Sequence, residues 1–360
     1  MRKPFKRITV KIGSNVIARA DGTLDVARIS ALVAQVAGLH KQGTEILLVS
    51  SGAVASGRSA LKPAKKMDVV DERQLFSAIG QAKLMNHYWQ LFEEHGITVG
   101  QLLTTKENFA DRRGYLNQRN CLWVMLANGV VPVINENDAV SVTELMFTDN
   151  DELSGLVASM MNADALFILS NVDGIYTGMP GRQGVELIPT IETGTDVSSY
   201  VQATKSSFGR GGMLTKTKIA QKISEEGIDV FIANGRRDQI LPQLMANWQE
   251  TPCTHFPAAK EGVSSVKKWI AHSDGFAKGS VFIDENAMQA LHGTKAVSLL
   301  PVGVVRIEGD FEKDDIIRIF TDKGKYIGVG KAAYSSEKVQ EVLGTKNQKP
   351  LVHYNYLHLE

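Results

Sequence analysis

The sequence predicts an α/β fold, an αβα sandwich with a mainly parallel central sheet, followed by a small C-terminal β-barrel domain. Apolar strands alternate with amphipathic helices through the larger part of the chain, which is the pattern of a parallel sheet covered on both faces. Short strands spaced by Gly and Asp replace this pattern after residues 251–273. A length of 360 residues also suggests two domains, which we expect at residues 1–253 and 276–350, with a linker at 254–275.

The expected elements follow one another in chain order. In the first domain we expect strands at residues 7–12, 45–50, 97–103, 130–134, 165–170 and 228–233. Helices are expected between them at residues 25–40, 72–95, 111–127, 153–161 and 217–226. In the second domain we expect strands at residues 280–284, 303–308, 315–320 and 326–330, with one helix at 285–292. In an open parallel sheet ligands bind beyond the carboxyl ends of the strands, so we look for a site there.

The composition excludes several classes of protein. The apolar fraction of 43% and charged fraction of 22% are typical of a soluble globular chain. The net charge of +1 argues against a chain-wide nucleic-acid or membrane footprint, and no apolar run reaches the ~20 residues that span a bilayer. We expect Cys121 and Cys253 to be reduced core thiols of a cytoplasmic protein. The histidines show no metal-ligand spacing, and we expect no resident metal site.

Two polar clusters at the predicted sheet edge are the main candidate site. Residues 135–138 (NEND) follow a buried strand, and residues 148–151 (TDND) open an apolar helix. Asp and Asn are also common helix caps and turn formers, which is the ordinary interpretation of any one of them. One cap needs one residue, so two such clusters together favour a ligand site.

Three other stretches could bind an anion. Lys11 ends the first strand beside Gly13, and a buried lysine is costly unless it faces charge, although a strand-end lysine can also reach water. The small residues 51–57 and the glycine-rich residues 208–216 open helices, whose free N–H groups suit phosphate. They could equally serve close packing or form a flexible turn, and the second lacks the GxxxxGK[ST] spacing. Two lysines and a carboxylate cluster suit phosphoryl transfer, which needs positive charge and positioning.

These motifs resemble those of the amino acid kinase family. The resemblance runs through VKIGSNVI, LLVSSGAVASG, VPVINENDAV, TDNDELSGLVA and GRGGMLTK, over residues 5–250. The stretches GSVFID, SLLPVGV and EGDF resemble a PUA domain. Within the family, NENDAV and DNDELSG resemble the members that phosphorylate the γ-carboxylate of L-glutamate with ATP, the first step of proline biosynthesis. The resemblance implies ATP and Mg²⁺ as cofactors, proline as an inhibitor, a homodimer or homotetramer, and a cytoplasmic location without membrane attachment.

The resemblance also implies roles for individual residues. Lys11, Lys216 and Asp151 would be catalytic, with Asp151 organising both lysines. Glutamate would be bound by Ser51, Asp138, Asn150, Asn135 and Asp149. ATP would be bound by Lys11, Gly13, Ser170, Asn171, Arg210, Gly211, Gly212, Met213, Leu214, Thr215 and Lys216. Asn171 and Arg210 depart from the family pattern, which often has Asp and a small residue there.

Two alternatives stay open at this point. A kinase of the same fold could act on N-acetylglutamate, aspartate, carbamate or UMP, because fold alone does not fix the acceptor. The PUA-like tail could instead bind RNA. Acidic and basic residues are nearly balanced over residues 254–350, without an arginine-rich stripe or an aromatic stacking run, so we do not expect RNA binding to be the main function.

Overall fold

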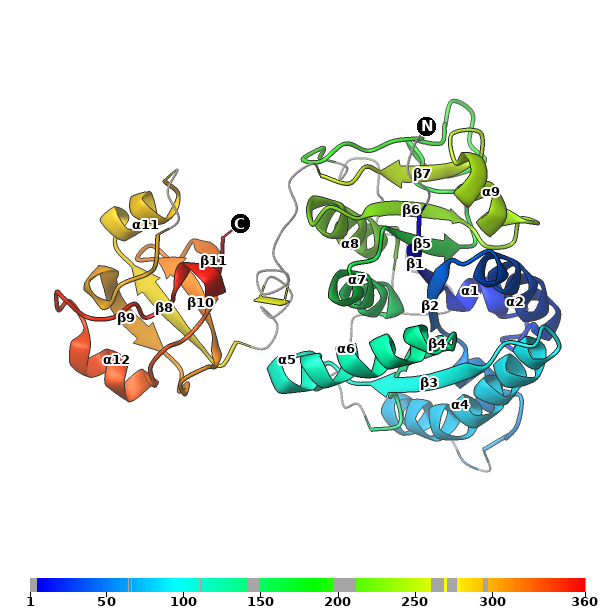
Figure 1. Ribbon diagram of the computed structural model, residues 1–360, viewed down its shortest axis with the longest axis horizontal. Coiled ribbons are helices and arrows are strands. Elements are labelled where there is room, and N and C mark those ends of the chain that lie inside the picture. The colour runs from blue at the N-terminus through cyan, green and yellow to red at the C-terminus, as the bar shows by residue number, and fades with distance from the viewer. Residues whose placement is uncertain are drawn as a thin grey trace. The chain divides into compact units, whose positions relative to one another are not determined.

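The chain forms two compact units, residues 1–262 and 263–360, which are described separately. The computed structural model describes residues 5–63, 65, 67–110, 112–140, 149–196, 212–259, 269–270, 277–293 and 297–359 (Figure 1). Residues 254–256, which we expected in the linker, lie in a strand of the first unit. None of the helices in these ranges is long and apolar enough to cross a membrane.

A seven-stranded sheet forms the centre of the first unit, with strand order β3-β4-β2-β1-β5-β6-β7. All neighbouring strands pair in parallel except β6 and β7, which are antiparallel. The first strand therefore lies in the middle, and the carboxyl ends of its neighbours flank its own carboxyl end. The strands are β1 (Arg7–Ile12), β2 (Glu45–Ser50), β3 (Val99–Thr104), β4 (Val131–Glu136), β5 (Ala165–Ser170), β6 (Asp229–Asn234) and β7 (Cys253–Phe256).

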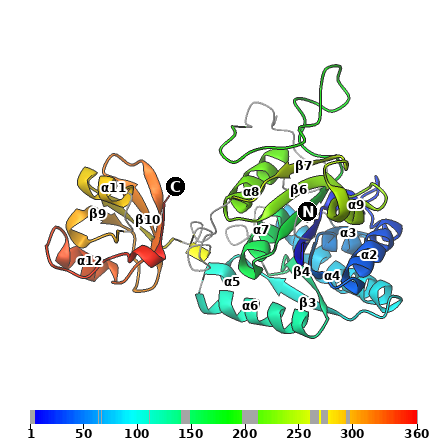
Figure 2. The same cartoon turned by 45° about the horizontal axis from the view of Figure 1, so that its top comes forward.

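Helices cover both faces of this sheet (Figures 1 and 2). Alternate residues of the strands enter two hydrophobic clusters, one packed against α2, α4 and α9 and the other against α7 and α8. This confirms the expected αβα sandwich. The helices are α1 (Ser14–Ile17), α2 (Val26–Lys41), α3 (Ala53–Arg58), α4 (Val69–Glu93), α5 (Glu107–Ala110), α6 (Arg112–Ala127), α7 (Asn150–Met161), α8 (Met213–Glu225) and α9 (Ile240–Asn247).

Side-chain caps explain where two helices differ from the sequence prediction. The Asp68 side chain accepts from the N–H groups of Val70 and Asp71, so α4 begins at Val69 rather than at residue 72. Asp149 caps α7 in the same way, and that helix begins at Asn150 rather than at residue 153. An acceptor at the cap satisfies N–H groups that the helix leaves unpaired, which extends the helix toward its amino end.

Glycines let α4 approach the sheet edge through α3. A Cβ on Gly80 of α4 would lie 1.8 Å from the carbonyl oxygen of Ala53, and one on Gly57 of α3 would lie 2.0 Å from that of Phe76. Neither contact is possible, so both positions require glycine for this packing. The close approach makes α4 a wall of the crevice beyond the strand ends.

The second unit contains a five-stranded sheet of order β12-β11-β10-β8-β9. Strands β10 and β8 pair in parallel, and the other neighbours are antiparallel. The strands and the helix that we expected in this unit are present. The short elements α12 and β12 of this unit had no clear sequence signal, and neither did α9 and β7 of the first unit. The unit contains β8 (Gly279–Ile283), α11 (Glu285–Leu291), β9 (Val304–Glu308), β10 (Ile316–Thr321), β11 (Tyr326–Lys331), α12 (Ser336–Val342) and β12 (Leu357–Leu359).

Candidate active site

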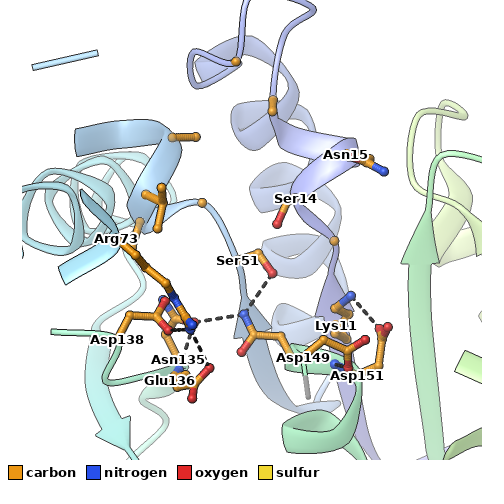
Figure 3. Close-up of a pocket in the computed structure, with 18 of the residues that line it drawn as sticks. Lys11, Ser14, Asn15, Ser51, Arg73, Asn135, Glu136, Asp138, Asp149 and Asp151 are labelled. Atoms are coloured by element: carbon orange, nitrogen blue, oxygen red, sulfur yellow. Dashed lines mark hydrogen bonds and ion pairs between the residues drawn. The ribbon is translucent and has the colours of Figure 1, made fainter. Parts of the chain in front are cut away.

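A cavity of about 400 Å³ opens beyond the carboxyl ends of the parallel strands. Its wall includes residues from β1, β4 and β5, from the turn after β2, and from the starts of α3, α4 and α7 (Figure 3). A cavity therefore lies at the edge of the sheet where the sequence predicted a ligand site. The residues used below that line it are Lys11, Gly13, Ser51, Arg58, Glu72, Arg73, Asn135, Glu136, Asp138, Asp149, Asn150, Asp151, Ser170 and Lys216.

One buried carboxylate joins two lysines at one end of the cavity. The Oδ1 atom of Asp151 lies 2.5 Å from Lys11 Nζ, and its Oδ2 atom lies 2.8 Å from Lys216 Nζ. Asp151 is 0% exposed, and both lysines are buried. Burial alone would raise the pKa of Asp151, but the two lysines outweigh it and hold that pKa well below its usual value. Burial alone would lower the pKa of Lys216, but Asp151 raises it, so this lysine stays charged.

The three partners come from three different elements. Lys11 lies in the central strand β1, Asp151 in the first turn of α7, and Lys216 in the first turn of α8. Burying charges is unfavourable unless they are paired and hydrogen-bonded, which explains why the three groups lie within contact distance. The arrangement leaves a net charge of about +1 facing the cavity, which suits a phosphate.

Asp149 serves as the cap of α7 and also faces this cluster. Its Oδ1 atom accepts from the N–H groups of Asp151 at 2.8 Å and Glu152 at 3.1 Å. Burial, together with the negative charge of Asp151, raises the pKa of Asp149 to about 7. The ordinary interpretation of this cluster, helix capping, is thus correct for Asp149 and does not account for its neighbours.

A chain of amide and hydroxyl groups crosses the middle of the cavity. The Nδ2 atom of Asn150 donates to Ser51 Oγ at 2.9 Å and to Asn135 Oδ1 at 3.0 Å. Asn135 in turn donates through its own Nδ2 to Gln81 Oε1 of α4 at 2.8 Å. The Oδ1 atom of Asn150 is buried without a hydrogen-bond partner. A buried acceptor of this kind is costly unless a ligand donates to it.

The far end of the cavity carries two carboxylates and one guanidinium. Arg73 Nη2 lies 3.2 Å from Glu136 Oε2 and also forms an ion pair with Asp138 Oδ1. Burial raises the pKa of Asp138, and Arg73 offsets part of that rise. In Figure 3 this group lies to one side of Ser51, and Lys11 with Asp151 lies to the other. The cavity therefore has a cationic end and an end of mixed charge.

The structure brings together most of the residues that the sequence singled out. Lys11, Asp151 and Lys216 meet at one end, and Ser170 and Gly13 lie beside them on the cavity wall. Ser51, Asn135, Asp138, Asp149 and Asn150 line the rest. Gly212 caps α8, and Met213, Leu214 and Thr215 form its first turn. Asn171 is exposed next to Ser170, whereas Arg210 and Gly211 lie outside the described residues.

Arg73 and Gln81, which have close contacts in the site, were not singled out from the sequence, and Glu136 was part of the NEND cluster but had no individual role. Arg73 and Gln81 lie within a long helix of mixed polarity, and Glu136 is the last residue of β4. No spacing distinguishes a polar residue on the inner face of such a helix from one facing water. The one available signal is the pair Gly57 and Gly80, which indicates close packing of the two helices.

Within the described ranges, no group of three or more His, Cys, Asp or Glu side chains could hold a metal ion. The buried carboxylate of Asp151 is occupied by its two lysines. Mg²⁺ at kinase sites is commonly held in large part by the phosphates of the nucleotide. The donor set here fits that arrangement rather than a resident metal cage.

The fold and the lysine pair define a phosphotransferase of a known class. The family model described as the amino acid kinase family matches residues 6–234, and that of the PUA domain matches residues 279–354. The chain therefore belongs to the amino acid kinase family. A solved structure of an isopentenyl phosphate kinase is 16% identical to this chain, with a TM-score of 0.50. The match covers 69% of this chain and 99% of the kinase, and it concerns the fold alone.

Two curated relatives narrow the comparison to one group within that family. The chain is 63% identical over 360 residues to the glutamate 5-kinase of Bacteroides thetaiotaomicron, covering 100% of both chains. It is 48% identical over 357 residues to the glutamate 5-kinase of Chlorobaculum tepidum, covering 99% of this chain and 98% of the relative.

Proposed function

We propose that the chain transfers the γ-phosphoryl group of ATP to the γ-carboxylate of L-glutamate, giving L-glutamyl 5-phosphate in the first step of proline biosynthesis. The observation that carries the proposal is the bridge from Asp151 to Lys11 and Lys216, 2.5 and 2.8 Å long, at one end of the cavity. The full-length relatives named glutamate 5-kinases support the choice of acceptor.

The two lysines would act as fixed positive charges over the moving phosphoryl group. Negative charge is spread over its oxygens in the transition state, and ammonium groups held in place stabilise it without reorganising. Asp151 would keep the two ammonium groups a constant distance apart. No general base is needed, because a γ-carboxylate with an ordinary pKa of about 4.3 is already ionised at neutral pH.

ATP would lie at the cationic end of the cavity. Gly13 leaves room there, since a Cβ on it would meet the carbonyl oxygen of Leu169 at 3.0 Å and Lys11 Nζ at 3.5 Å. The first turn of α8, from Met213 to Lys216, offers N–H groups to phosphate oxygens. Mg²⁺ would arrive with the nucleotide and neutralise part of its charge.

Glutamate would occupy the middle and the far end. Its ammonium group matches the carboxylate of Asp138, and its carboxylates match the hydroxyl of Ser51 and the amide of Asn135. Asn150 would contribute its buried Oδ1, which has no hydrogen-bond partner and would accept from a donor of the substrate. This orientation directs the γ-carboxylate toward Lys11 and Lys216. Asn171, Arg210 and Gly211 are retained as proposed nucleotide contacts on the resemblance alone.

Trapping of the acyl phosphate with hydroxylamine tests this function. The protein, ATP and Mg²⁺ should give γ-glutamyl hydroxamate with L-glutamate. N-acetylglutamate, aspartate, carbamate and UMP, compared through release of ADP, should each be used far more slowly. Release of ADP with one of these acceptors and not with glutamate would assign a different kinase activity to the same fold.

Other expectations remain proposals. We retain proline as an inhibitor acting through the glutamate site, a homodimer or homotetramer, and a cytoplasmic location. We also retain two domains joined by a linker. RNA binding by the second domain stays a minor alternative, which a salt-dependent gel shift with tRNA would test.

A further inference from the structure

Arg73 joins two carboxylates that lie on the other side of Ser51 from Lys11 and Asp151 (Figure 3). Its side chain is 18% exposed, and those of Glu136 and Asp138 are 5% and 14% exposed. One nitrogen, Nη2, contacts both carboxylates. The guanidinium thus lies between the end of β4 and the residue two positions beyond it.

Two carboxylates and one guanidinium meet at this end of the cavity. Two carboxylates share the guanidinium, so the group carries a net charge of about −1 when both are ionised. Arg58 and Glu72 also line the cavity, but they pair with each other at 3.1 Å. The ammonium of an α-amino acid would bring a positive charge beside the carboxylate of Asp138, which lines the cavity.

Without a cation beside them, two nearly buried carboxylates would not both stay ionised. Burial raises the pKa of Asp138 above its usual value, and the charge of Arg73 with the hydrogen bonds of Arg73 and Glu136 offsets only part of that rise. Like charges in a shared site push one carboxylate toward its neutral form. A protonated Asp138 would no longer attract an ammonium group.

We propose that Arg73 is the positioning residue of the substrate's ammonium site, holding Glu136 and Asp138 in place and favouring the carboxylate form of Asp138 beside the α-amino group. The inference rests on the proposed function and adds a determinant of specificity to it. Arg73 lies on the other side of Ser51 from Lys11, which would hold the phosphoryl group, so it would act through the two carboxylates. Its planar guanidinium can contact two acceptors in fixed geometry, which a lysine ammonium on a flexible stem does not reproduce.

The test compares Arg73→Met and Arg73→Lys with the unchanged protein in hydroxamate formation. The KM for glutamate should rise on the order of tenfold or more in Arg73→Met and by less in Arg73→Lys. The kcat and the KM for ATP should stay within about twofold, because the cationic end of the cavity is intact. Arg7→Met is the matched control, since Arg7 is similarly buried, at 17%, and pairs with Glu45 outside the cavity.

Two further readouts separate positioning from a loss of folding. As the pH is lowered, the KM for glutamate should begin to rise at a higher pH in Arg73→Met than in the unchanged protein, because Asp138 takes up a proton more readily without Arg73. The preference for glutamate over glutarate, which lacks the ammonium, should fall in Arg73→Met and hold in Arg7→Met. Arg73→Lys supplies both readouts if Arg73→Met does not fold.

An unchanged KM for glutamate, an equal rise in the KM for ATP, or an unchanged preference over glutarate would each overturn the inference. These outcomes differ from a failure of the proposed function itself. If the proposed function is wrong, the unchanged protein forms no γ-glutamyl hydroxamate.

Discussion

Lys216 and Asp151 lie 65 residues apart in the chain, yet Lys216 Nζ and Asp151 Oδ2 are 2.8 Å apart in a buried ion pair. They belong to the first turns of two helices, α8 and α7, that pack on the same face of the sheet. The second oxygen of Asp151 contacts Lys11 in the central strand. One carboxylate therefore fixes the relative positions of two helices and a strand at the cavity.

Replacing this carboxylate should reduce both stability and activity. Asp151→Asn leaves two buried lysines without a counter-charge, and we expect a loss of about 3–5 kcal/mol in the free energy of unfolding. We also expect kcat to fall by about 10² or more, because the ammonium groups are no longer held in place. Urea unfolding and hydroxamate formation measure the two effects.

Asp314→Asn is a suitable control for that substitution. Asp314 is 60% exposed and pairs with Lys331 in the second unit, so its loss should cost less than about 1 kcal/mol. Equal destabilisation by the two substitutions would contradict the importance given to the buried bridge.

The raised pKa of Asp149 predicts a pH dependence of stability in the absence of nucleotide. Because this pKa rises from 3.8 to about 7 on folding, the folded protein binds the proton more tightly than the unfolded chain does. The contribution of Asp149 to the free energy of unfolding is fully present below its unfolded pKa, near pH 4. This contribution is lost as the pH rises through the folded pKa of about 7. Asp149→Asn keeps an acceptor for the helix cap but has no titration.

Thermal unfolding over this pH range measures the effect. The Tm of Asp149→Asn should increase relative to that of the unchanged protein as the pH rises from about 4 to about 7. A difference in Tm that stays constant across this range would show that Asp149 titrates as an ordinary carboxyl group.

Gln81 should affect glutamate binding without touching glutamate. Its Oε1 atom accepts from Asn135 Nδ2, and Asn135 Oδ1 accepts from Asn150. Gln81→Met removes the acceptor at nearly constant volume, leaving a buried N–H group unpaired at about 1 kcal/mol or more. The KM for glutamate should rise about fivefold, whereas Gln81→Glu keeps the acceptor and should retain more of the affinity. Initial rates at varied glutamate concentrations give the KM of each variant. If both variants have the KM of the unchanged protein, the hydrogen bonds from Gln81 through Asn135 to Asn150 do not support glutamate binding.

Two glycine substitutions should change stability in opposite directions. Gly80→Ala places a Cβ 1.8 Å from a backbone oxygen, so α3 and α4 must separate. We expect a loss of about 1–3 kcal/mol in the free energy of unfolding and a higher KM for glutamate. Gly38→Ala in α2 meets nothing within 4 Å and should stabilise the protein by about 0.5–1 kcal/mol. Chemical unfolding measures both changes. A free energy of unfolding that Gly80→Ala leaves unchanged would contradict the close packing of α3 and α4 as the reason for this glycine.

The sequence was most informative where strong local patterns coincide with chemistry. Lys11 lies near the end of a strand, and Asp151 and Lys216 open helices, so parallel-sheet topology predicts a shared edge for them. Arg73 and Gln81 were not predicted, because a polar residue within a long helix looks the same whether it faces water or a cavity. Likewise, β7 contains only Cys253–Phe256, and its apolar pattern is too short to separate a strand from a loop.

The most direct measurement of the central claim is kcat for γ-glutamyl hydroxamate formation by Lys216→Met and Lys11→Met under saturating ATP and glutamate. Lys218→Met is the control, because Lys218 is an exposed residue of the same helix, α8. If the two buried lysines stabilise the transferring phosphoryl group, each substitution should lower kcat by about 10²–10³, and the control should leave it unchanged. A kcat within tenfold of the unchanged protein in either buried-lysine variant would contradict the account.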